Sequence, residues 1–132
     1  MALEKPYHDI PGTIVFDAEM SRKGYHLNQF FMSLMKAENR KRFLDDEKAY
    51  MDEWPLSDIQ KKGILEKDYN LLIENGGNIY FLAKLFYTYE LPFERAVSTM
   101  TGMTPEEYRA MMLSGGRPIE GNRSIAENEG AK

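Results

Sequence analysis

The clearest signal of the fold lies near the start of the chain, in the run Ser21-Arg22-Lys23-Gly24-Tyr25-His26-Leu27-Asn28-Gln29-Phe30-Phe31-Met32-Ser33-Leu34. The large apolar residues of this run share one helix face, at i, i+3, i+4 and i+7: Leu27, Phe30, Phe31 and Leu34. We therefore predict an amphipathic helix that begins near His26, just after Gly24. The run also keeps polar side chains that a purely structural helix would not need.

Other local signals mark where further helices begin and end. Two residue pairs have the spacing of a capping box, in which side chains satisfy backbone groups of the first helical turn: Ser57 with Gln60, and Thr104 with Glu107. We expect the helix that starts at Ser57 to continue to Leu72, before the strong stop Asn75-Gly76-Gly77. Asn78 then caps a helix that is apolar on nearly all sides, which predicts the central buried helix.

Several short helices complete the prediction. A turn of helix is expected over residues 17–22, a break between Ala37 and Asp46, and a helix over residues 93–100. No stretch alternates in the manner of a strand, and no repeat is evident. The fold class is therefore all-α, a compact single domain of several short helices.

The two ends of the chain differ in composition from its middle. Prolines and a glycine interrupt any helix over residues 1–13, which we predict to be an extended arm. Residues 14–116 form the predicted helical domain, and the apolar residues 14–16 are candidates for anchoring the arm to it. Residues 117–132 contain few large apolar side chains, which predicts an irregular tail.

The composition excludes several classes of protein. The 132 residues carry a net charge of −4 and no cysteine. The charge argues against a nucleic-acid binder, and the absence of cysteine removes disulfides and thiolate metal sites. No window approaches the roughly 18 consecutive apolar residues of a membrane span, and no secretory signal is visible. We therefore expect no nucleic acid or membrane partner, and a cytoplasmic location.

Few residues of the chain could carry out chemistry. Only His8 and His26 are present. A non-haem iron site of the oxygenase kind needs two histidines and a carboxylate, so such a site would use both and leave no histidine for proton transfer. No nucleophile elbow frames a serine. The acidic run at residues 45–47 is interpreted as a solvated helix face, and Trp54 as a core anchor between helices. The residues alone thus predict a domain without catalytic residues of its own, and its aromatic and Met side chains would suit a partner surface.

Three ordered blocks resemble the small, or alpha, subunit family of protocatechuate 4,5-dioxygenase. The first extends from Arg22-Lys23-Gly24-Tyr25 through Met32-Ser33-Leu34-Met35-Lys36-Ala37-Glu38-Asn39-Arg40 to Asp52-Glu53-Trp54. The second is Gly76-Gly77-Asn78 with Tyr80-Phe81-Leu82 and Lys84-Leu85-Phe86. The third is Ser98-Thr99-Met100-Thr101-Gly102-Met103-Thr104 with Glu106-Glu107-Tyr108, Met111-Met112 and Gly115-Gly116-Arg117.

The resemblance implies a role in an extradiol ring-cleaving dioxygenase. In that family the large beta subunit carries the ferrous iron, the alpha subunit is all-helical and covers the mouth of the active site, and the assembly is an α2β2 heterotetramer. A catecholic acid substrate would lie at the subunit interface, and this chain would bind no iron itself. A phenylalanine of the alpha subunit reaches the substrate pocket, and by position it corresponds to Phe93, which would otherwise be a core residue at a helix start.

Other residues of the blocks allow more than one role. Tyr25 and Asn28 are candidates for facing the substrate pocket or the beta subunit, or for holding the arm in place. Before Phe93 the family has an Asp-Gly-Lys-Ser stretch, whereas this chain has Tyr89-Glu90-Leu91-Pro92, which should be stiffer because proline fixes its own φ. The substrate is therefore open between protocatechuate, gallate and a methoxylated analogue. The alternative function is a non-catalytic helical interaction module for another partner.

Overall fold

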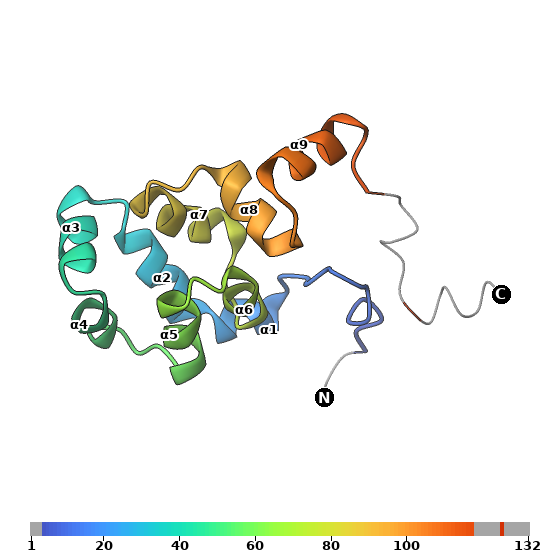
Figure 1. Cartoon of the computed structure of the whole chain (residues 1–132). Coiled ribbons are helices and arrows are strands. Elements are labelled where there is room, and N and C mark those ends of the chain that lie inside the picture. Colours follow the sequence, from blue (N-terminus) through green and yellow to red (C-terminus); the bar gives the residue numbers. More distant parts are fainter. Residues whose placement is uncertain (1–3, 118–124, 126–132) are drawn as a thin grey trace.

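The computed structural model describes residues 4–117 and residue 125, and this part of the chain is helical without any strand. The all-α prediction is confirmed. In chain order the helices are α1 (Ala18–Lys23), α2 (Tyr25–Ser33), α3 (Ala37–Asp45), α4 (Glu47–Asp52), α5 (Asp58–Leu65), α6 (Tyr69–Glu74), α7 (Ile79–Thr88), α8 (Phe93–Thr101) and α9 (Pro105–Leu113). Figure 1 shows α3 and α4 at one end of the molecule and α9 at the other. Within the described residues, no helix has the length and apolarity needed to cross a bilayer.

The core forms where α2 packs along α7, with α8 against α7 and with Phe43 of α3 and Tyr50 of α4 against Phe30 of α2. The fully buried side chains include every member of the predicted α2 face: Leu27, Phe30, Phe31 and Leu34. The Phe30 ring meets Phe43 edge-on, with 5.6 Å between centroids, and also contacts Trp54 at 6.1 Å. Aromatic rings at these separations and angles attract one another beyond simple burial. Trp54 is thus packed against the core, as its interpretation as a core anchor predicted.

The break after α2 comes earlier than the sequence indicated, and a second break follows. The chain leaves the helix at Leu34, whereas we expected the break between Ala37 and Asp46. Asp46 does lie at the second break, where its side chain accepts a hydrogen bond from the Ala49 N–H and caps α4. Asp is a favoured N-cap because its short carboxylate reaches the free N–H groups of a first helical turn.

The helix predicted from Ser57 to Leu72 is two helices, so that prediction was wrong at its middle. Its capping box is present, but α5 ends at Leu65, and Lys67 takes a left-handed φ of 55° that reverses the chain. The Asp68 N–H then bonds to the Gly63 carbonyl oxygen at 2.9 Å. Gly63 allows α6 to fold back onto α5, because a β-carbon there would lie 2.8 Å from Leu72 Cδ2.

Helix α7 is only partly buried, which corrects the expectation of a helix covered on all sides. Leu82, Leu85 and Phe86 lie in the core, but Tyr80 and Tyr87 are exposed. Tyrosine counts as apolar in a sequence pattern, yet its hydroxyl suits a position at the edge of water. The pattern therefore overstated how far the other helices surround α7.

The N-terminal arm is made of turns and is held by charge. Its residues 4–16 contain turns closed by the His8 and Thr13 N–H groups, in place of the predicted extended chain, and the apolar residues 14–16 are exposed instead of anchored. The Lys5 ammonium contacts the carboxylates of Asp17 and Glu19, and the Tyr7 hydroxyl donates to Asp17 at 3.0 Å. The Met20 N–H and then Lys5 hold the pKa of Asp17 well below its usual range.

The last helix, α9, has the predicted capping box at Thr104 and Glu107, with Pro105 in its first turn. None of its residues is buried. It ends at Leu113 with Ser114 as its C-cap, and the next residue, Gly115, has the left-handed φ of 111° that the glycine pair indicated. The predicted tail begins at residue 117, and its residues 118–124 and 126–132 lie outside the described part, as do residues 1–3. The Ile125 N–H bonds to the Asp9 carbonyl oxygen at 3.3 Å.

Candidate functional site

Phe93 is the first residue of α8 and lies at the surface. Its side chain is 53% exposed, while Ala96, one turn on, is buried in the core. The Phe93 ring touches Phe86 of α7 with 6.1 Å between centroids, so one side of the ring rests on the core and the other faces solvent. Phe93 is therefore available to another molecule.

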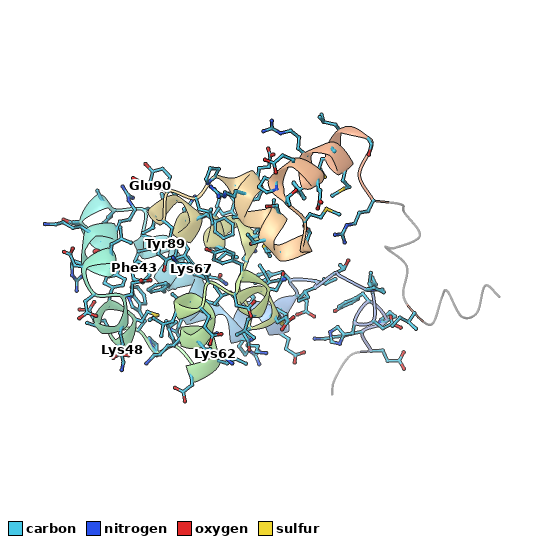
Figure 2. The ribbon with its side chains drawn as sticks, in the orientation of Figure 1. Phe43, Lys48, Lys62, Lys67, Tyr89 and Glu90 are labelled. Carbon is cyan, nitrogen blue, oxygen red and sulfur yellow. The ribbon has the colours of Figure 1, made fainter. Side chains whose placement is uncertain are left out.

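Two side-chain contacts hold the loop that precedes Phe93. The Tyr89 hydroxyl donates a hydrogen bond to the Glu47 carboxylate of α4, and the Lys67 ammonium lies 4.6 Å from the Tyr89 ring centroid. Burial, followed by the hydrogen bond to Glu47, raises the pKa of Tyr89. Figure 2 shows Tyr89 near Phe43 and Lys67, of which Phe43 is buried and Lys67 is exposed. The loop is thus fixed to α4 and to the α5–α6 turn.

The backbone of the same loop also has a defined geometry. Glu90 has a left-handed φ of 55°, and the Leu91 N–H returns to the Phe86 carbonyl oxygen at 2.9 Å. This is the Schellman pattern that ends a helix, with glutamate where glycine is usual. Pro92 is then the N-cap of α8, with φ −57°. Phe93 consequently follows a turn that is closed by hydrogen bonds and by a fixed proline angle.

Tyr25 begins α2 and is 57% exposed. Its ring meets His26 edge-on at 5.1 Å between centroids. Among the described residues no ring contact joins Tyr25 to Phe93, so the structure does not bring these two candidate site residues into contact.

Asn28 lies inside the protein, where it is 7% exposed. Its Nδ2 donates to the Gly76 carbonyl oxygen at 2.9 Å, and its Oδ1 accepts from the Asn78 N–H at 3.0 Å. Both halves of the amide thus join α2 to the loop between α6 and α7. Gln60 adds a similar link, since its Nε2 donates to the Asn75 carbonyl oxygen at 2.9 Å. Asn28 therefore holds the backbone of the α6–α7 loop and not that of the N-terminal arm, and its contact with substrate stays a prediction.

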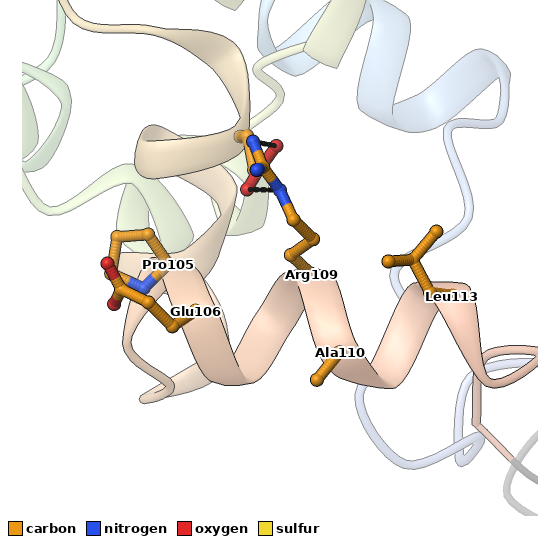
Figure 3. Close-up of a pocket in the computed structure, with 6 residues that line it drawn as sticks. Pro105, Glu106, Arg109, Ala110 and Leu113 are labelled. Carbon is orange, nitrogen blue, oxygen red and sulfur yellow. Dashed lines mark hydrogen bonds and ion pairs between the residues drawn. The ribbon is translucent and has the colours of Figure 1, made fainter.

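A cavity at the loop between α7 and α8 was not foreseen from the sequence. It has a volume of about 550 Å³ and is lined by Arg40, Leu44, Tyr87, Thr88, Glu90, Leu91 and Pro92. A smaller one of about 330 Å³ lies along α9, where Arg109 makes two hydrogen bonds to the Glu94 carboxylate at 3.0 and 3.1 Å (Figure 3). Aromatic and arginine side chains at a cavity rim are typical of protein interfaces. The spacing of Arg40 and Tyr87 in the sequence carries no signal that could have found the first cavity.

Metal-ligating side chains do not converge in the described part of the chain. Within residues 4–117 and 125, no group of three His, Asp or Glu side chains is placed to hold a metal ion. The acidic residues near α4 have other contacts: Glu53 with Arg42, and Asp52 with Lys61. These residues do not fit the iron centre of a ring-cleaving oxygenase.

Comparison with known proteins assigns the chain to a family. Residues 27–113 match the family described as aromatic-ring-opening dioxygenase LigAB, LigA subunit. The chain belongs to the LigA family. The match begins in α2 and ends with the last residue of α9, so it includes Asn28 and Phe93 but not Tyr25. The family is described by the LigA subunit of the aromatic-ring-opening dioxygenase LigAB.

The chain also matches part of a longer protein. The gallate dioxygenase of Pseudomonas putida strain KT2440 is 33% identical over 76 residues, which are 58% of this chain and 22% of that protein. The chain therefore matches less than a quarter of the relative's length. Most of the gallate dioxygenase lies outside the LigA-like segment.

Proposed function

We propose that this chain is the non-iron alpha subunit of an extradiol dioxygenase of the protocatechuate 4,5-dioxygenase type, in which it caps and shapes the active site of an iron-carrying beta subunit. The observation that carries the proposal is the family match across α2 to α9. The assembly would be an α2β2 heterotetramer that acts in the breakdown of lignin-derived aromatic acids.

The gallate dioxygenase of Pseudomonas putida supports the need for a partner. The segment like this chain makes up 22% of that protein. The matching family is described as one subunit of the dioxygenase LigAB. We therefore infer that a beta subunit supplies here what the rest of the chain supplies in that relative.

The proposal assigns ferrous iron to the beta subunit. The side chains of the described residues do not fit a metal centre, as set out above. In such enzymes the iron supplies the activation of oxygen and of the catechol ring. This chain would contribute walls to the site, and no step of the reaction would pass through its own carboxylates or imidazoles.

Phe93 is the side chain that we propose to meet the substrate. Its half-exposed ring stands on a turn held by Tyr89 and Pro92, so it is presented outward without being free to collapse. An aromatic wall packs against a flat ring and fixes its orientation. Closing the site also excludes water, which strengthens the electrostatic interactions inside it.

The substrate class is a catecholic acid, with protocatechuate and gallate as the first two candidates. Gallate has one hydroxyl more than protocatechuate, and that hydroxyl would need a partner in the pocket. Tyr25 and Asn28 were the other candidates for substrate contact. Tyr25 keeps an exposed hydroxyl that could serve, while the amide of Asn28 is occupied within the chain.

The experiment that tests the proposal is co-expression with a candidate iron-carrying large subunit from the same organism. Oxygen uptake and ring-opened product should appear with protocatechuate or gallate for the complex and not for either chain alone. Mass measurement of the complex tests the α2β2 arrangement. Ring cleavage by the isolated chain, loaded with Fe(II), would contradict the proposal, and so would a large subunit whose activity is unchanged by this chain. The second result would favour an interaction module for another partner.

A further inference from the structure

A cavity of about 720 Å³ lies where the end of α2, the start of α3 and the end of α4 meet. The side chains of Met32, Met35 and Trp54 form its apolar wall. Trp54 is half-buried, because its ring contacts Phe30 in the core while the side chain also lines the cavity. Flat rings pack favourably on an indole, and a methionine thioether adapts to their shape. The volume and the wall therefore suit a small aromatic molecule.

The charges around this cavity leave the Lys36 ammonium without an acceptor. Arg42 Nη2 lies 2.6 and 2.8 Å from the two carboxylate oxygens of Glu53, so these two charges offset each other. Lys36 is exposed at the same cavity, and within residues 4–117 and 125 its ammonium makes no hydrogen bond or ion pair. An ammonium forms its stronger hydrogen bonds with carboxylate oxygens. The cavity therefore favours a ligand that carries a carboxylate.

Two oxygen atoms of the lining keep the capacity to accept a hydrogen bond. Ser33 donates its single hydroxyl hydrogen to the Phe30 carbonyl oxygen at 2.6 Å, so the Tyr50 hydroxyl is the donor in the 2.6 Å contact between Ser33 and Tyr50. The Tyr50 oxygen therefore still has a lone pair to offer. Asn39 donates through Nδ2 to the Ser33 carbonyl oxygen at 2.9 Å, and its Oδ1 has no donor among the described residues. Both oxygens suit a hydroxyl group on the ligand.

We propose that this cavity binds a small hydroxylated aromatic carboxylate. Lys36 pairs with the carboxylate, Trp54 and the two methionines pack on the ring, and the hydroxyl donates to Tyr50 or Asn39. The inference goes beyond the proposed function and does not rest on it, because every group that it uses belongs to this chain. The ligand class thus has three features, and each is recognised by a different part of the lining.

Titration of the full chain with para-hydroxybenzoate tests the site. Trp54 is the only tryptophan of the sequence, so its indole N–H gives a single NMR resonance that reports on this cavity. That resonance should shift and saturate with a dissociation constant of about 1 mM or lower. Benzoate lacks the hydroxyl, para-hydroxybenzyl alcohol lacks the carboxylate, and cyclohexanecarboxylate lacks the flat ring. Each should bind at least about threefold more weakly than para-hydroxybenzoate.

Two exposed lysines provide a matched pair of variants. Lys36→Glu reverses the charge at the cavity and should raise the dissociation constant of para-hydroxybenzoate by about fivefold or more. Lys41→Glu makes the same change of net charge on α3 outside the lining, and it should stay within about twofold of the unchanged chain. Both side chains are exposed, so neither change should disturb the core, and the unfolding midpoint of each variant checks this.

Several outcomes would overturn the site. A Trp54 resonance that does not shift up to about 10 mM para-hydroxybenzoate would show that the cavity does not bind this class. Equal weakening by Lys36→Glu and Lys41→Glu would reduce the binding to attraction by net charge. A resonance that shifts with the concentration of the chain alone would make a second copy the occupant. Since the chain is measured without a partner, loss of this site would leave the proposed function standing, and an inactive complex would leave this site standing.

Discussion

Gly24 and Gly76 lie back to back, with their backbones in direct contact. A β-carbon on Gly24 would overlap the carbonyl group of Gly76, and one on Gly76 would lie 2.5 Å from Gly24 Cα. Gly76 also has a left-handed φ of 94°. The contact joins the start of α2 to the loop before α7, and these are the two helices that form the centre of the core. Close backbone approach of this kind requires glycine on both sides.

Gly24→Ala should therefore destabilise the chain by at least about 2 kcal/mol, because overpacking forces the two backbones apart. The free energy of unfolding in urea measures this loss. Gly102→Ala is the matched control, since Gly102 has φ 73° but no atom within 4 Å of a built β-carbon. It should cost only the left-handed strain of about 1 kcal/mol. Equal losses at the two positions would show that the α2–α7 contact is not close-packed.

Asn28 predicts a second effect at the same junction. Asn28→Ala leaves the Gly76 carbonyl and the Asn78 N–H without their partner, which should cost about 1–3 kcal/mol. Asn28→Asp keeps the acceptor but loses the donor, and regains a donor only when the carboxyl is protonated. Its deficit relative to the unchanged chain should therefore be smaller at about pH 4 than at pH 7. Urea unfolding at the two pH values checks this. A raised KM of the complex without any loss of stability would instead assign Asn28 to the substrate.

Features that depend on neighbouring residues could be predicted from the sequence, whereas features that depend on residues far apart in the chain could not. The capping boxes at Ser57 and Thr104 need only four consecutive residues, so both were found with their correct starts. The break at Lys67 could not be seen, because lysine rarely takes a left-handed φ and the reason for the turn is α6 packing on Gly63. Likewise, Asn28 serves backbone atoms that lie 48 and 50 residues further along the chain.

The same distinction applies to the residues of the candidate site. Phe93 came from the resemblance of ordered blocks, since nothing in its local spacing separates an exposed helix start from a core position. The contact between Arg40 and Tyr87 depends on how α3 and α7 meet, and no pattern within either helix indicates it. The sequence therefore indicated the class of protein and proposed Phe93 as a site residue, whereas the contact between Arg40 and Tyr87 is visible only in the fold.

Two non-glycine residues with left-handed φ predict a matched pair of stabilising changes. Lys67 and Glu90 both have φ 55° at the end of a helix. Glu90→Gly should raise the free energy of unfolding by about 0.5–1 kcal/mol, because relief of the left-handed strain exceeds the added freedom of glycine in the unfolded chain. Lys67→Gly should gain less, since it also loses the cation over the Tyr89 ring. The midpoints of urea unfolding measure both gains in stability. A larger gain for Lys67→Gly than for Glu90→Gly would show that the Lys67 ammonium over the Tyr89 ring does not stabilise the fold.

Tyr89 predicts loss of stability in alkali. Its pKa is raised in the folded chain by burial and by the hydrogen bond to Glu47. Above its ordinary pKa of 10.0 the unfolded chain releases this proton while the folded chain retains it, so stability falls as the pH rises beyond that value. Tyr89→Phe removes the contribution of Tyr89 to this loss of stability. The contribution of Tyr69 remains, because burial also raises the pKa of Tyr69. Unfolding free energies between about pH 8 and pH 11 should therefore slope less steeply for Tyr89→Phe. Parallel slopes would show that Tyr89 does not govern the alkaline loss.

Phe93 predicts a separation of stability from activity. Because the ring is 53% exposed, Phe93→Ala should cost the isolated chain no more than about 1.5 kcal/mol. Phe86→Ala, which removes the buried ring beneath it, should cost about 3–5 kcal/mol. In the complex, Phe93→Ala should lower kcat/KM for catecholic acids by about tenfold or more, and Phe93→Leu, which restores an apolar wall, should recover part of it. Unchanged kinetics for Phe93→Ala, or a stability loss equal to that of Phe86→Ala, would return Phe93 to the role of a core residue at a helix start.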